Sequence, residues 1–431
     1  MITTGGNGSW STIENLLEPI QLPKMVKVRQ IQPHPPAVDV EAEIIRQIAE
    51  KNLLAPIKAG DTVAITCGSR GIANMPLAVK TMVRLIKEVG GDPFLVPAMG
   101  SHAGATAEGQ TQMLIGMGYG EEEMGAPIRA TMETVELDHT DDGLPVLCDK
   151  YAAEADHLVV MNRIKPHVCF RGPYESGLMK MFTIGLGKQK GANIAHSLGF
   201  GHMPHHIPDI GNKSIAKLNV LCAIGLIENA FHDTAVCKVL AKDEIAKEEP
   251  ALLDQAKSFA AYLFFDQLDT LIIDEVGKNI SGSGFDTNVV GRYHSEWVSG
   301  GPKIKRVVIL DISKASKGNG NGIGMADFTT RRAVEKFDFA QTYPNTLTAT
   351  LTGSVKIPMT LPNDLQAIKS CVKTSNLVDF ADVTMVRIHN TLCLDEIEVS
   401  ENLLPQIRDD ARFEILSEPY EMVFDQDGNL F

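Results

Sequence analysis

The feature that most constrains the fold is a regular alternation of short apolar runs with amphipathic stretches over the first two thirds of the chain. The apolar runs Thr62–Thr66, Pro93–Pro97 and His157–Met161 have the length and composition of buried strands. Between them, Met75–Val89 and Thr106–Met117 carry apolar residues at helical spacing. Strands that alternate with helices are joined by crossovers and pair in parallel. The sequence therefore predicts an α/β fold with a mostly parallel sheet.

The length of the chain predicts more than one domain. At 431 residues it is too long for one ordinary hydrophobic core, and strand-like runs resume at Asp269–Asp274 and Arg306–Ile312. We predict an N-terminal α/β domain over residues 1–268 and a C-terminal α/β domain over residues 269–399, with an active-site crevice between them. Residues 400–431 are expected to return to the N-terminal domain.

Composition narrows the classes of partner. A formal net charge of −14 argues against nucleic acid, because affinity for a phosphate backbone depends on Lys and Arg. The sequence has no run of about eighteen apolar residues and no secretory layout at its N-terminus, so it predicts a cytoplasmic protein with no membrane partner. The seven cysteines are spread without a C-x-x-C pair, which argues against a disulfide framework or an iron–sulfur centre. The expected partner is a small molecule.

Four reactive side chains lie in loop-like segments of the N-terminal half. His102 lies in M-G-S-H-A-G and His167 in I-K-P-H-V, each shortly after a predicted strand. Lys180 lies in S-G-L-M-K-M and His196 in N-I-A-H-S. Residues just past the carboxyl ends of parallel strands line the ligand crevice of an open α/β sheet. There, two imidazoles can exchange protons, while an amine and a third imidazole can hold an electrophilic or metallic group.

Each of these residues also has a structural interpretation. The two histidines could be capping or core residues, and Lys180 could be a solvated lysine with a packed stem. An amine whose pKa is lowered by burial can instead bond to carbonyl-like carbons. The H-M-P-H-H cluster is interrupted by proline and is expected at the surface or in a loop. Residues of the same types compete for the two holding roles: Lys188 and Lys190 with Lys180, and His202, His205 and His206 with His196.

Two further segments have the composition of anion sites. Arg70 follows the first predicted strand, where its guanidinium could grip a carboxylate and the next helix would add its N-terminal amides. Gly322 lies in G-N-G-N-G-I-G (318–324), after the strand Arg306–Ile312. A glycine-rich turn lets backbone amides approach a phosphate or a pyridinium ring, although a flexible loop is the simpler interpretation.

Taken in order, these motifs resemble the nickel-dependent lactate racemase family. The resemblance rests on His102, on the K-P-H motif that ends at His167, on the glycine-containing loop that ends at Lys180, and on His196 sixteen residues later. It is strongest over residues 55–200. As an ordered set, the motifs are more specific than any one of them alone.

The resemblance implies a racemase or epimerase of a 2-hydroxy acid that acts by hydride and proton transfer. It implies a covalently attached nickel-pincer nucleotide, pyridinium-3,5-bisthiocarboxylic acid mononucleotide, linked to Lys180 and loaded by cofactor-synthesis proteins. His196 would be the nickel ligand, and His102 and His167 would be the catalytic proton carriers on opposite faces of the substrate. Arg70 and Gly322 would contact the cofactor, and Arg70 would also bind the substrate carboxylate.

Three departures from the family pattern concern the substrate. In V-A-I-T-C-G-S-R (63–70), Cys67 stands where the family's loop carries an aspartate. Lys180 lies thirteen positions after His167, a longer spacing than in the lactate enzymes, and the residues between them include R-G-P-Y-E. The family's Gln-x-x-Lys substrate clamp is missing, and the matching stretch F-D-T-N-V-V-G-R-Y-H offers Arg292 or His294 instead. These differences imply a 2-hydroxy acid other than lactate.

Two other functions remain open from the residues alone. A metal- or NAD-dependent hydroxyacid dehydrogenase would use the same crevice and release the keto acid, although no G-x-G-x-x-G follows the first predicted strand. A non-catalytic carboxylate- or cofactor-binding protein would bind its ligand without turnover. Reduction of nicotinamide, and stereochemical exchange in deuterated water, distinguish these alternatives from a racemase.

Overall fold

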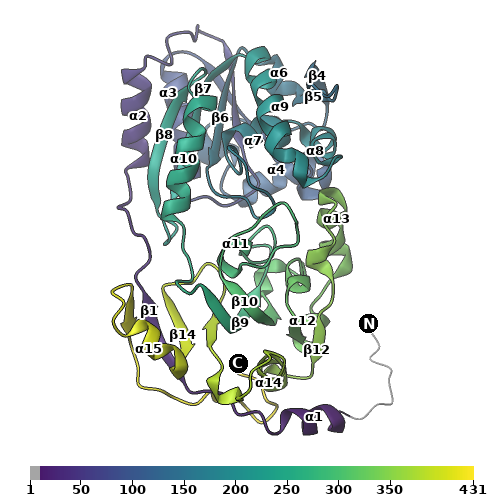
Figure 1. Ribbon diagram of the computed structural model, residues 1–431. Helices are drawn as coiled ribbons and strands as arrows, with labels where there is room; N and C mark the ends of the chain where they lie inside the picture. Colours follow the sequence, from purple (N-terminus) through teal and green to yellow (C-terminus); the bar gives the residue numbers. More distant parts are fainter. Residues whose placement is uncertain (1–9) are drawn as a thin grey trace. The chain divides into compact units, whose positions relative to one another are not determined.

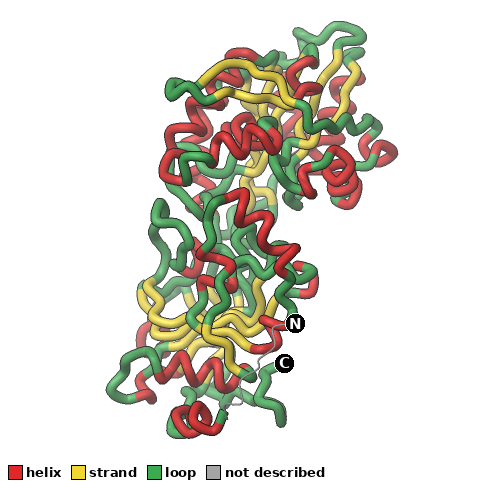
Figure 2. Tube along the Cα trace, turned by 90° about the vertical axis from the view of Figure 1, so that its right-hand side faces the viewer, coloured by secondary structure: helices red, strands yellow, loops and turns green. Residues whose placement is uncertain are grey.

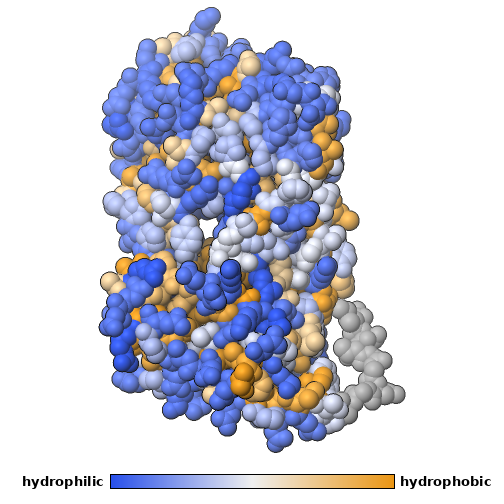
Figure 3. Space-filling view, viewed as in Figure 1, coloured by the Kyte–Doolittle hydropathy of each residue, from blue (hydrophilic) through white to orange (hydrophobic). Residues whose placement is uncertain are grey.

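The computed structural model describes residues 10–431, which divide into two compact units (Figure 1 and Figure 2). The central unit comprises residues 33–260, and the terminal unit combines residues 10–32 with residues 261–431. Figure 3 shows hydrophilic residues over most of one face, with apolar residues in smaller patches. Within the described residues, no helix is both long and apolar enough to span a membrane.

The central unit is built on a five-stranded sheet with the order β3-β2-β6-β7-β8. The first four strands are parallel, and β8 pairs antiparallel with β7. Because β3, β2 and β6 run in one direction, their carboxyl ends meet at one side, here called the central carboxyl edge. The strands are β2 (Thr62–Cys67), β3 (Asp92–Pro97), β6 (His157–Arg163), β7 (Val220–Glu228) and β8 (Thr234–Ala241).

Helices cover both faces of this sheet (Figure 1). α2 (Val40–Glu50) and α3 (Met75–Glu88) share one apolar cluster with β2 and β7, and α10 (Ile245–Phe259) packs against β7 and β8. The strands and helices predicted between residues 62 and 161 are therefore present, with ends that differ by one or two residues. The other elements of the unit are α4 (Ala107–Gly116), α5 (Glu121–Met124), β4 (Thr134–His139), β5 (Pro145–Asp149), α6 (Lys150–Glu154), α7 (Leu178–Lys180), α8 (Lys188–His196) and α9 (Met203–Lys217).

The terminal unit is built on an eight-stranded sheet with the order β12-β11-β10-β9-β13-β14-β1-β15. The strands from β12 to β13 are parallel, and β14, β1 and β15 are antiparallel to their neighbours. The predicted fold class, α/β with mostly parallel sheets, is confirmed, whereas the crevice between domains stays a prediction. The strands are β1 (Met25–Gln30), β9 (Gln267–Val276), β10 (Lys303–Ile312), β11 (Phe328–Thr330), β12 (Met359–Leu361), β13 (Met385–Ile388), β14 (Glu396–Ser400) and β15 (Phe413–Ile415). The helices are α1 (Ser11–Leu17), α11 (Thr287–Val290), α12 (Arg331–Glu335), α13 (Phe339–Ala349), α14 (Asp364–Lys373) and α15 (Leu404–Ile407).

The strand pairing corrects the predicted domain boundaries. β1 pairs with β14 on one side and with β15 on the other, so residues 400–431 do not return to the N-terminal domain, and residues 10–32 leave it. Val26 and Val28 of β1 pack in the same apolar cluster as Leu271 of β9. Pairing between strands at opposite ends of a chain leaves no local signal in the sequence, which is why the boundary is misplaced by sequence reasoning.

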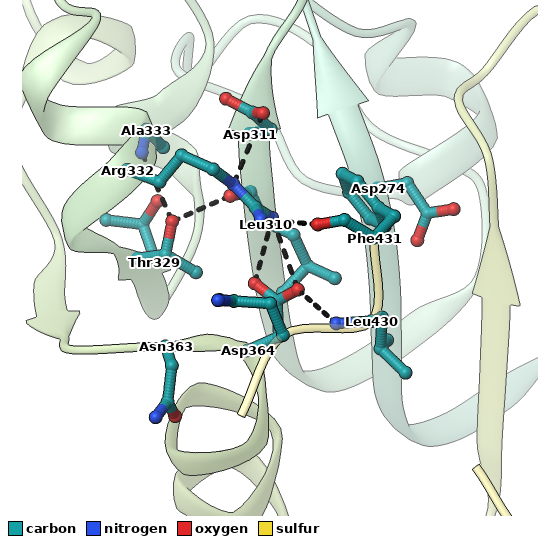
Figure 4. Close-up of polar contacts among 12 residues, drawn as sticks. Asp274, Leu310, Asp311, Thr329, Arg332, Ala333, Asn363, Asp364, Leu430 and Phe431 are labelled. Atoms are coloured by element: carbon teal, nitrogen blue, oxygen red, sulfur yellow. Dashed lines mark hydrogen bonds and ion pairs between the residues drawn. The ribbon is translucent and has the colours of Figure 1, made fainter. Parts of the chain in front are cut away.

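A group of polar contacts, here called the C-terminal clasp, holds the last residues on the terminal unit (Figure 4). Arg332 of α12 donates to the Asp364 carboxylate at 3.0 and 3.2 Å and to the Phe431 carbonyl oxygen at 2.9 Å. Asp364 also accepts the N–H of Leu430 at 2.9 Å, and Arg332 Nε lies 3.3 Å from the Asp311 carboxylate. Because a buried carboxylate is costly without a cation, the guanidinium joins α12, α14 and the tail.

Candidate functional site

Three of the residues singled out by the sequence follow adjacent parallel strands. Arg70 comes after β2, His102 after β3 and His167 after β6. These strands are neighbours in the sheet, so the three loops begin at the central carboxyl edge. This is where an open α/β sheet places its ligand-binding loops.

His102 is fixed by contacts with two neighbouring segments. Its Nδ1 lies 2.9 Å from the Ser69 Oγ, and its carbonyl oxygen accepts from Gln110 Nε2 at 3.3 Å. Residues 103–105 all have positive φ, at 54°, 70° and 53°, a left-handed conformation that costs energy for the two alanines. A constrained turn therefore sets the backbone beside this imidazole.

His167 is held on both sides of its backbone. Its N–H donates to the Glu175 carboxylate at 2.7 Å, and its carbonyl oxygen accepts from Arg171 Nη1 at 2.7 Å. The imidazole Nδ1 accepts the N–H of Cys169 at 3.1 Å, so this hydrogen bond assigns the proton of the neutral ring to Nε2. The ring also lies 4.4 Å from the ring of Phe170. Nε2 is therefore the atom of His167 suited to exchange a proton with a ligand.

Lys180 ends helix α7, directly before a π-helical stretch at Met181–Gly185. Within residues 10–431, its amine has no hydrogen-bond or ion-pair partner. Burial, helped by the positive charges of Lys165 and Arg70, lowers the pKa of Lys180 to about 8. A substantial fraction of such an amine is neutral near physiological pH, so it can act as a nucleophile.

His196 is the last residue of α8 and lies within electrostatic reach of Lys180. Its Nδ1 is buried and has no hydrogen-bond partner in the described part of the chain. Burial, together with the charge of Lys180, lowers the pKa of His196 to about 4. The ring is therefore neutral at ordinary pH, and a neutral imidazole is the form that binds a metal ion.

The two lysines that competed with Lys180 are in different surroundings. Lys188 is fully buried, and its amine donates to the carbonyl oxygen of Pro97 at 2.9 Å and to Gln110 Oε1 at 2.6 Å. The Asp149 carboxylate lies 3.4 Å from the same amine. Lys190 is exposed on α8. Lys188 is therefore held in a structural network, and Lys190 is solvated. Of the three lysines, Lys180 is the half-buried one whose amine has no partner among the described residues.

The histidines that competed with His196 lie at the start of helix α9, not in a loop. Pro204 falls in the first helical turn, where proline is tolerated, so the loop alternative is wrong, while the surface position expected from the sequence holds for His202 and His205. His206 is buried, and its Nδ1 lies 3.3 Å from the Ala195 carbonyl oxygen, whereas His202 and His205 are exposed. Among residues 10–431, no three His, Cys, Asp or Glu side chains are grouped as a metal site.

Arg70 is a half-buried cation without an acidic partner in residues 10–431. Its Nη1 donates to the Ser69 carbonyl oxygen at 3.0 Å. Burial and the nearby charge of Arg163 lower its pKa, but a guanidinium remains protonated at ordinary pH. Arg163, by contrast, pairs with Glu228. Arg70 is thus suited to bind an anionic group of a ligand.

The glycine-rich loop of the terminal unit has a structural explanation. Gly322 has a φ of 105°, and its N–H donates to the Ser354 carbonyl oxygen at 2.9 Å. A Cβ at this position would lie 2.4 Å from the Ser283 carbonyl oxygen. Glycine is therefore required here by the close approach of two protein loops. Its contact with a cofactor stays a prediction.

The two predicted substrate residues of the terminal unit also have protein contacts. Arg292 Nη2 donates to the Asp327 carboxylate at 2.9 Å and to the carbonyl oxygen of Lys305 at 2.8 Å. His294 Nδ1 lies 3.2 Å from the Met325 sulfur, and burial lowers the pKa of this histidine to about 4. Their role toward a substrate stays a prediction.

Sequence reasoning missed the residues that hold His167 and Lys180. Glu175 and Arg171 bind the backbone of His167, and their four-residue spacing was the only available signal. Glu249 accepts the N–H of Met179 at 2.8 Å, directly before Lys180. This glutamate comes from α10, far along the chain, and no local pattern points to it.

Comparison with known proteins finds one family model and a solved structure that resemble this chain. Residues 13–207 match the family model described as the lactate racemase N-terminal domain. The chain is similar in fold to the lactate racemase apoprotein from Thermoanaerobacterium thermosaccharolyticum, with a TM-score of 0.51 and 13% sequence identity, covering 86% of this chain and 99% of that one. No curated protein sequence matches the chain significantly.

The matched segment contains every central-unit residue predicted for the site: Arg70, His102, His167, Lys180 and His196. At this level of identity the structural likeness shows the fold and does not establish an activity. The family model and the fold agree with the resemblance found in the ordered motifs. Residues 13–207 therefore match the lactate racemase N-terminal domain, and the chain shares the fold of a lactate racemase apoprotein.

Proposed function

We propose that this chain is an isomerase that racemises or epimerises a 2-hydroxy acid. The observation that carries the proposal is the pairing of two groups without partners, the Lys180 amine with its pKa of about 8 and the buried Nδ1 of His196. A buried ring nitrogen without a partner is costly to a fold, because burial removes its water without a replacement. A ligand that bonds to His196 Nδ1 would remove that cost, and the Lys180 amine could bond to the same ligand.

The donor set fits the family's nickel-pincer nucleotide. Attachment to a thiocarboxyl carbon requires a neutral amine, which Lys180 supplies near neutral pH, and nickel accepts the neutral imidazole of His196. Arg70 would bind an anionic group of the cofactor or the carboxylate of the substrate. When bound, the nickel-pincer nucleotide supplies the hydride chemistry, and the protein supplies orientation and proton transfer.

His102 and His167 divide the proton transfer in this proposal. One imidazole takes the hydroxyl proton of one stereoisomer, and the other returns a proton on the opposite face. The Cys169 N–H orients the His167 ring and the Ser69 hydroxyl orients the His102 ring, each through Nδ1. The two histidines therefore enter the cycle in defined ring orientations.

The chemistry around Arg70 favours a substrate other than lactate. Cys67 is buried, and burial raises the pKa of its thiol, so this loop position is uncharged where the family's aspartate would be negative. Arg70 is then not neutralised from that position. The proposal accordingly favours a larger or more polar acid, whose extra anionic or polar group this arginine could bind.

Co-expression with cofactor-synthesis proteins tests the cofactor assignment. Intact-mass spectrometry should show a covalent adduct, and peptide mapping should place it on the peptide that contains Lys180. Lys180→Ala should abolish the adduct, while the matched variant Lys190→Ala, at an exposed lysine nearby, should retain it. An adduct on Lys188 or Lys190, or none under loading conditions, contradicts the assignment.

Chiral chromatography of a panel of 2-hydroxy acids tests the activity. The loaded protein should interconvert the stereoisomers of at least one acid without a nicotinamide cofactor. Formation of keto acid with reduction of NAD would indicate a dehydrogenase instead. Tight binding without interconversion would indicate a binding protein.

A further inference from the structure

Helix α10 contacts the segment that carries both His167 and Lys180 at several separate points. This segment, residues 167–180, includes the R-G-P-Y-E stretch that lengthens it relative to the family pattern. The contacts come from the beginning, middle and end of α10, which spans Ile245–Phe259. A single helix therefore contacts the backbone segment that carries two reactive side chains.

The contact at the end of α10 passes through Glu175. This carboxylate is buried; one oxygen accepts the N–H of His167 at 2.7 Å, and the other lies 3.4 Å from the Lys257 amine of α10. Arg171 donates to the His167 carbonyl oxygen at 2.7 Å and lies 3.5 Å from Glu175. The backbone of His167 is thus held by a charged group that is itself tied to the helix.

The contacts at the beginning and middle of α10 hold the rest of the segment. The Tyr174 hydroxyl donates to the Ala246 carbonyl oxygen at 2.6 Å. Glu249 is 1% exposed and accepts the N–H of Met179, the residue before Lys180, at 2.8 Å. It fills the space beside Gly177, where a Cβ would lie 1.9 Å from Glu249 Oε1.

Two buried carboxyl groups are more than packing alone requires, and burial raises the pKa of Glu249 to about 8. Apolar side chains would attach the segment to α10 without the desolvation that a buried carboxyl group suffers. Unlike apolar side chains, the two carboxyl groups also fix the orientation of the backbone, since each accepts an individual backbone N–H. The N–H groups concerned belong to His167 and to the residue that precedes Lys180.

We propose that α10 sets the positions of both reactive side chains, with Glu175 as a positioning residue for His167 and Glu249 as a positioning residue for Lys180. The inference rests on the proposed function, because it takes these two side chains as the reactive ones. The positioning itself is a property of the unloaded protein and can be measured there.

The first test measures the titration of Lys180 by competitive acetylation with acetic anhydride and peptide mass spectrometry. In Glu249→Leu the Met179 N–H loses its acceptor, so the turn opens to water and the midpoint of Lys180 rises from about 8 toward the ordinary 10.5. Glu249→Gln keeps an acceptor oxygen and should keep the original midpoint. Glu248→Leu, on the exposed side of α10, is the matched control, and the exposed Lys190 is the internal reference. An unmoved Lys180 midpoint in Glu249→Leu, or an equal shift in Glu249→Gln, overturns the assignment.

The second test uses NMR of protein labelled with ¹⁵N-histidine, which reports the ring tautomer. Lys257→Met removes the half-exposed anchor of Glu175 and should fold, since it leaves the core intact. We expect the two ring nitrogens of His167 to move toward each other in shift, as Nδ1 loses its fixed donor, while His102 stays unchanged. Glu175→Gln keeps an acceptor for the His167 N–H and should change the His167 shifts less than Glu175→Leu. Wild-type His167 shifts in both Lys257→Met and Glu175→Leu overturn the role of Glu175.

Neither measurement requires cofactor or substrate, so the two proposals can fail separately. Altered Lys180 and His167 signals in the variants, without racemisation by loaded wild type, would support the positioning role and refute the proposed function. In loaded variants, Glu175→Leu should lower kcat about a hundredfold with little change in KM, the scale expected for a reactive group displaced by about 1 Å. The Gln variant should recover most of that loss.

Discussion

Basic side chains of the two units are in opposite states of pairing. In the central unit, the Lys180 amine and the Nδ1 of His196 have no hydrogen-bond partner among the described residues. In the terminal unit, Arg387 near the end of β13 donates to both oxygens of Asp274, at 2.8 and 3.0 Å, and lies 3.2 Å from Glu398. The comparison indicates that unpaired polar groups, more than the residue type, distinguish a candidate site from a structural network of ion pairs.

Among the tests of this comparison, Lys180→Ala is expected to have the largest effect on loading and activity. Covalent loading and racemisation should be lost completely, because no other buried amine of the central unit is without a partner in the described chain. Thermal stability should be retained or increased, since an uncompensated buried group is removed. Intact-mass spectrometry and thermal melting measure the two outcomes.

Lys188→Met is the matched contrast. It strips the cation from the buried Asp149 and should unfold at clearly lower denaturant concentration. If Lys180→Ala lost as much stability as Lys188→Met, Lys180 would be a structural residue and the comparison would fail.

His102→Ala and His167→Ala should have the next largest effect. Removal of a positioned general acid or base costs about two to four orders of magnitude in rate. Because one imidazole must be neutral and the other protonated in each direction, the wild-type pH profile should be bell-shaped. Chiral chromatography of loaded variants measures the rate. Near-normal turnover in either variant would show that the histidine is structural.

Breaking the buried ion pairs of the terminal unit is expected to lower its stability without removing a candidate site residue. Arg387→Leu leaves Asp274 and Glu398 without their cation and should destabilise the terminal unit by about 3–5 kcal/mol. Arg29→Leu, which breaks two exposed ion pairs on β1, is the control and should have little effect on stability. Urea denaturation measures both, and equal losses would contradict the distinction between buried and exposed pairs.

A pH dependence that both units share is also expected. His196 and His294 each have a pKa lowered by burial to about 4, below the unfolded value of 6.5. The unfolded state then binds more protons, so stability should fall as pH drops from 6.5 toward 4, by up to about 1.4 kcal/mol per pH unit for each group. His196→Asn and His294→Asn should each flatten the curve in urea titrations across this range. A curve left unchanged by both variants would refute the burial argument.

Local patterns predicted most of the central sheet. β2, β3 and β6 appear where apolar runs alternate with helical spacing, because in an α/β unit each strand is flanked by its own crossover helix. In the terminal sheet, only β9 and β10 of the parallel part were predicted. The partners of β1 are strands near the other end of the chain, and such pairing is set by tertiary contacts that leave no periodicity in the sequence.

The candidate site was predictable to the extent that its residues follow strands in order. Arg70, His102 and His167 fall at the central carboxyl edge, as the strand positions imply. Their environment was not predictable, since the lowered pKa of Lys180 depends on burial by distant segments. The contact of Glu249 beside Lys180 comes from α10 and could be found only in three dimensions.

The route of the chain also has a consequence for synthesis on the ribosome. Residues 33–260 can form their own sheet early in translation. β1 can pair only after its partner strands β14 and β15 have been translated, which is much later. Throughout that interval both edges of β1 are open, and an open apolar strand is a template for aggregation. A translational stall before residue 396 would therefore leave a folded central unit attached to an unprotected strand, a state that a chaperone would have to shield.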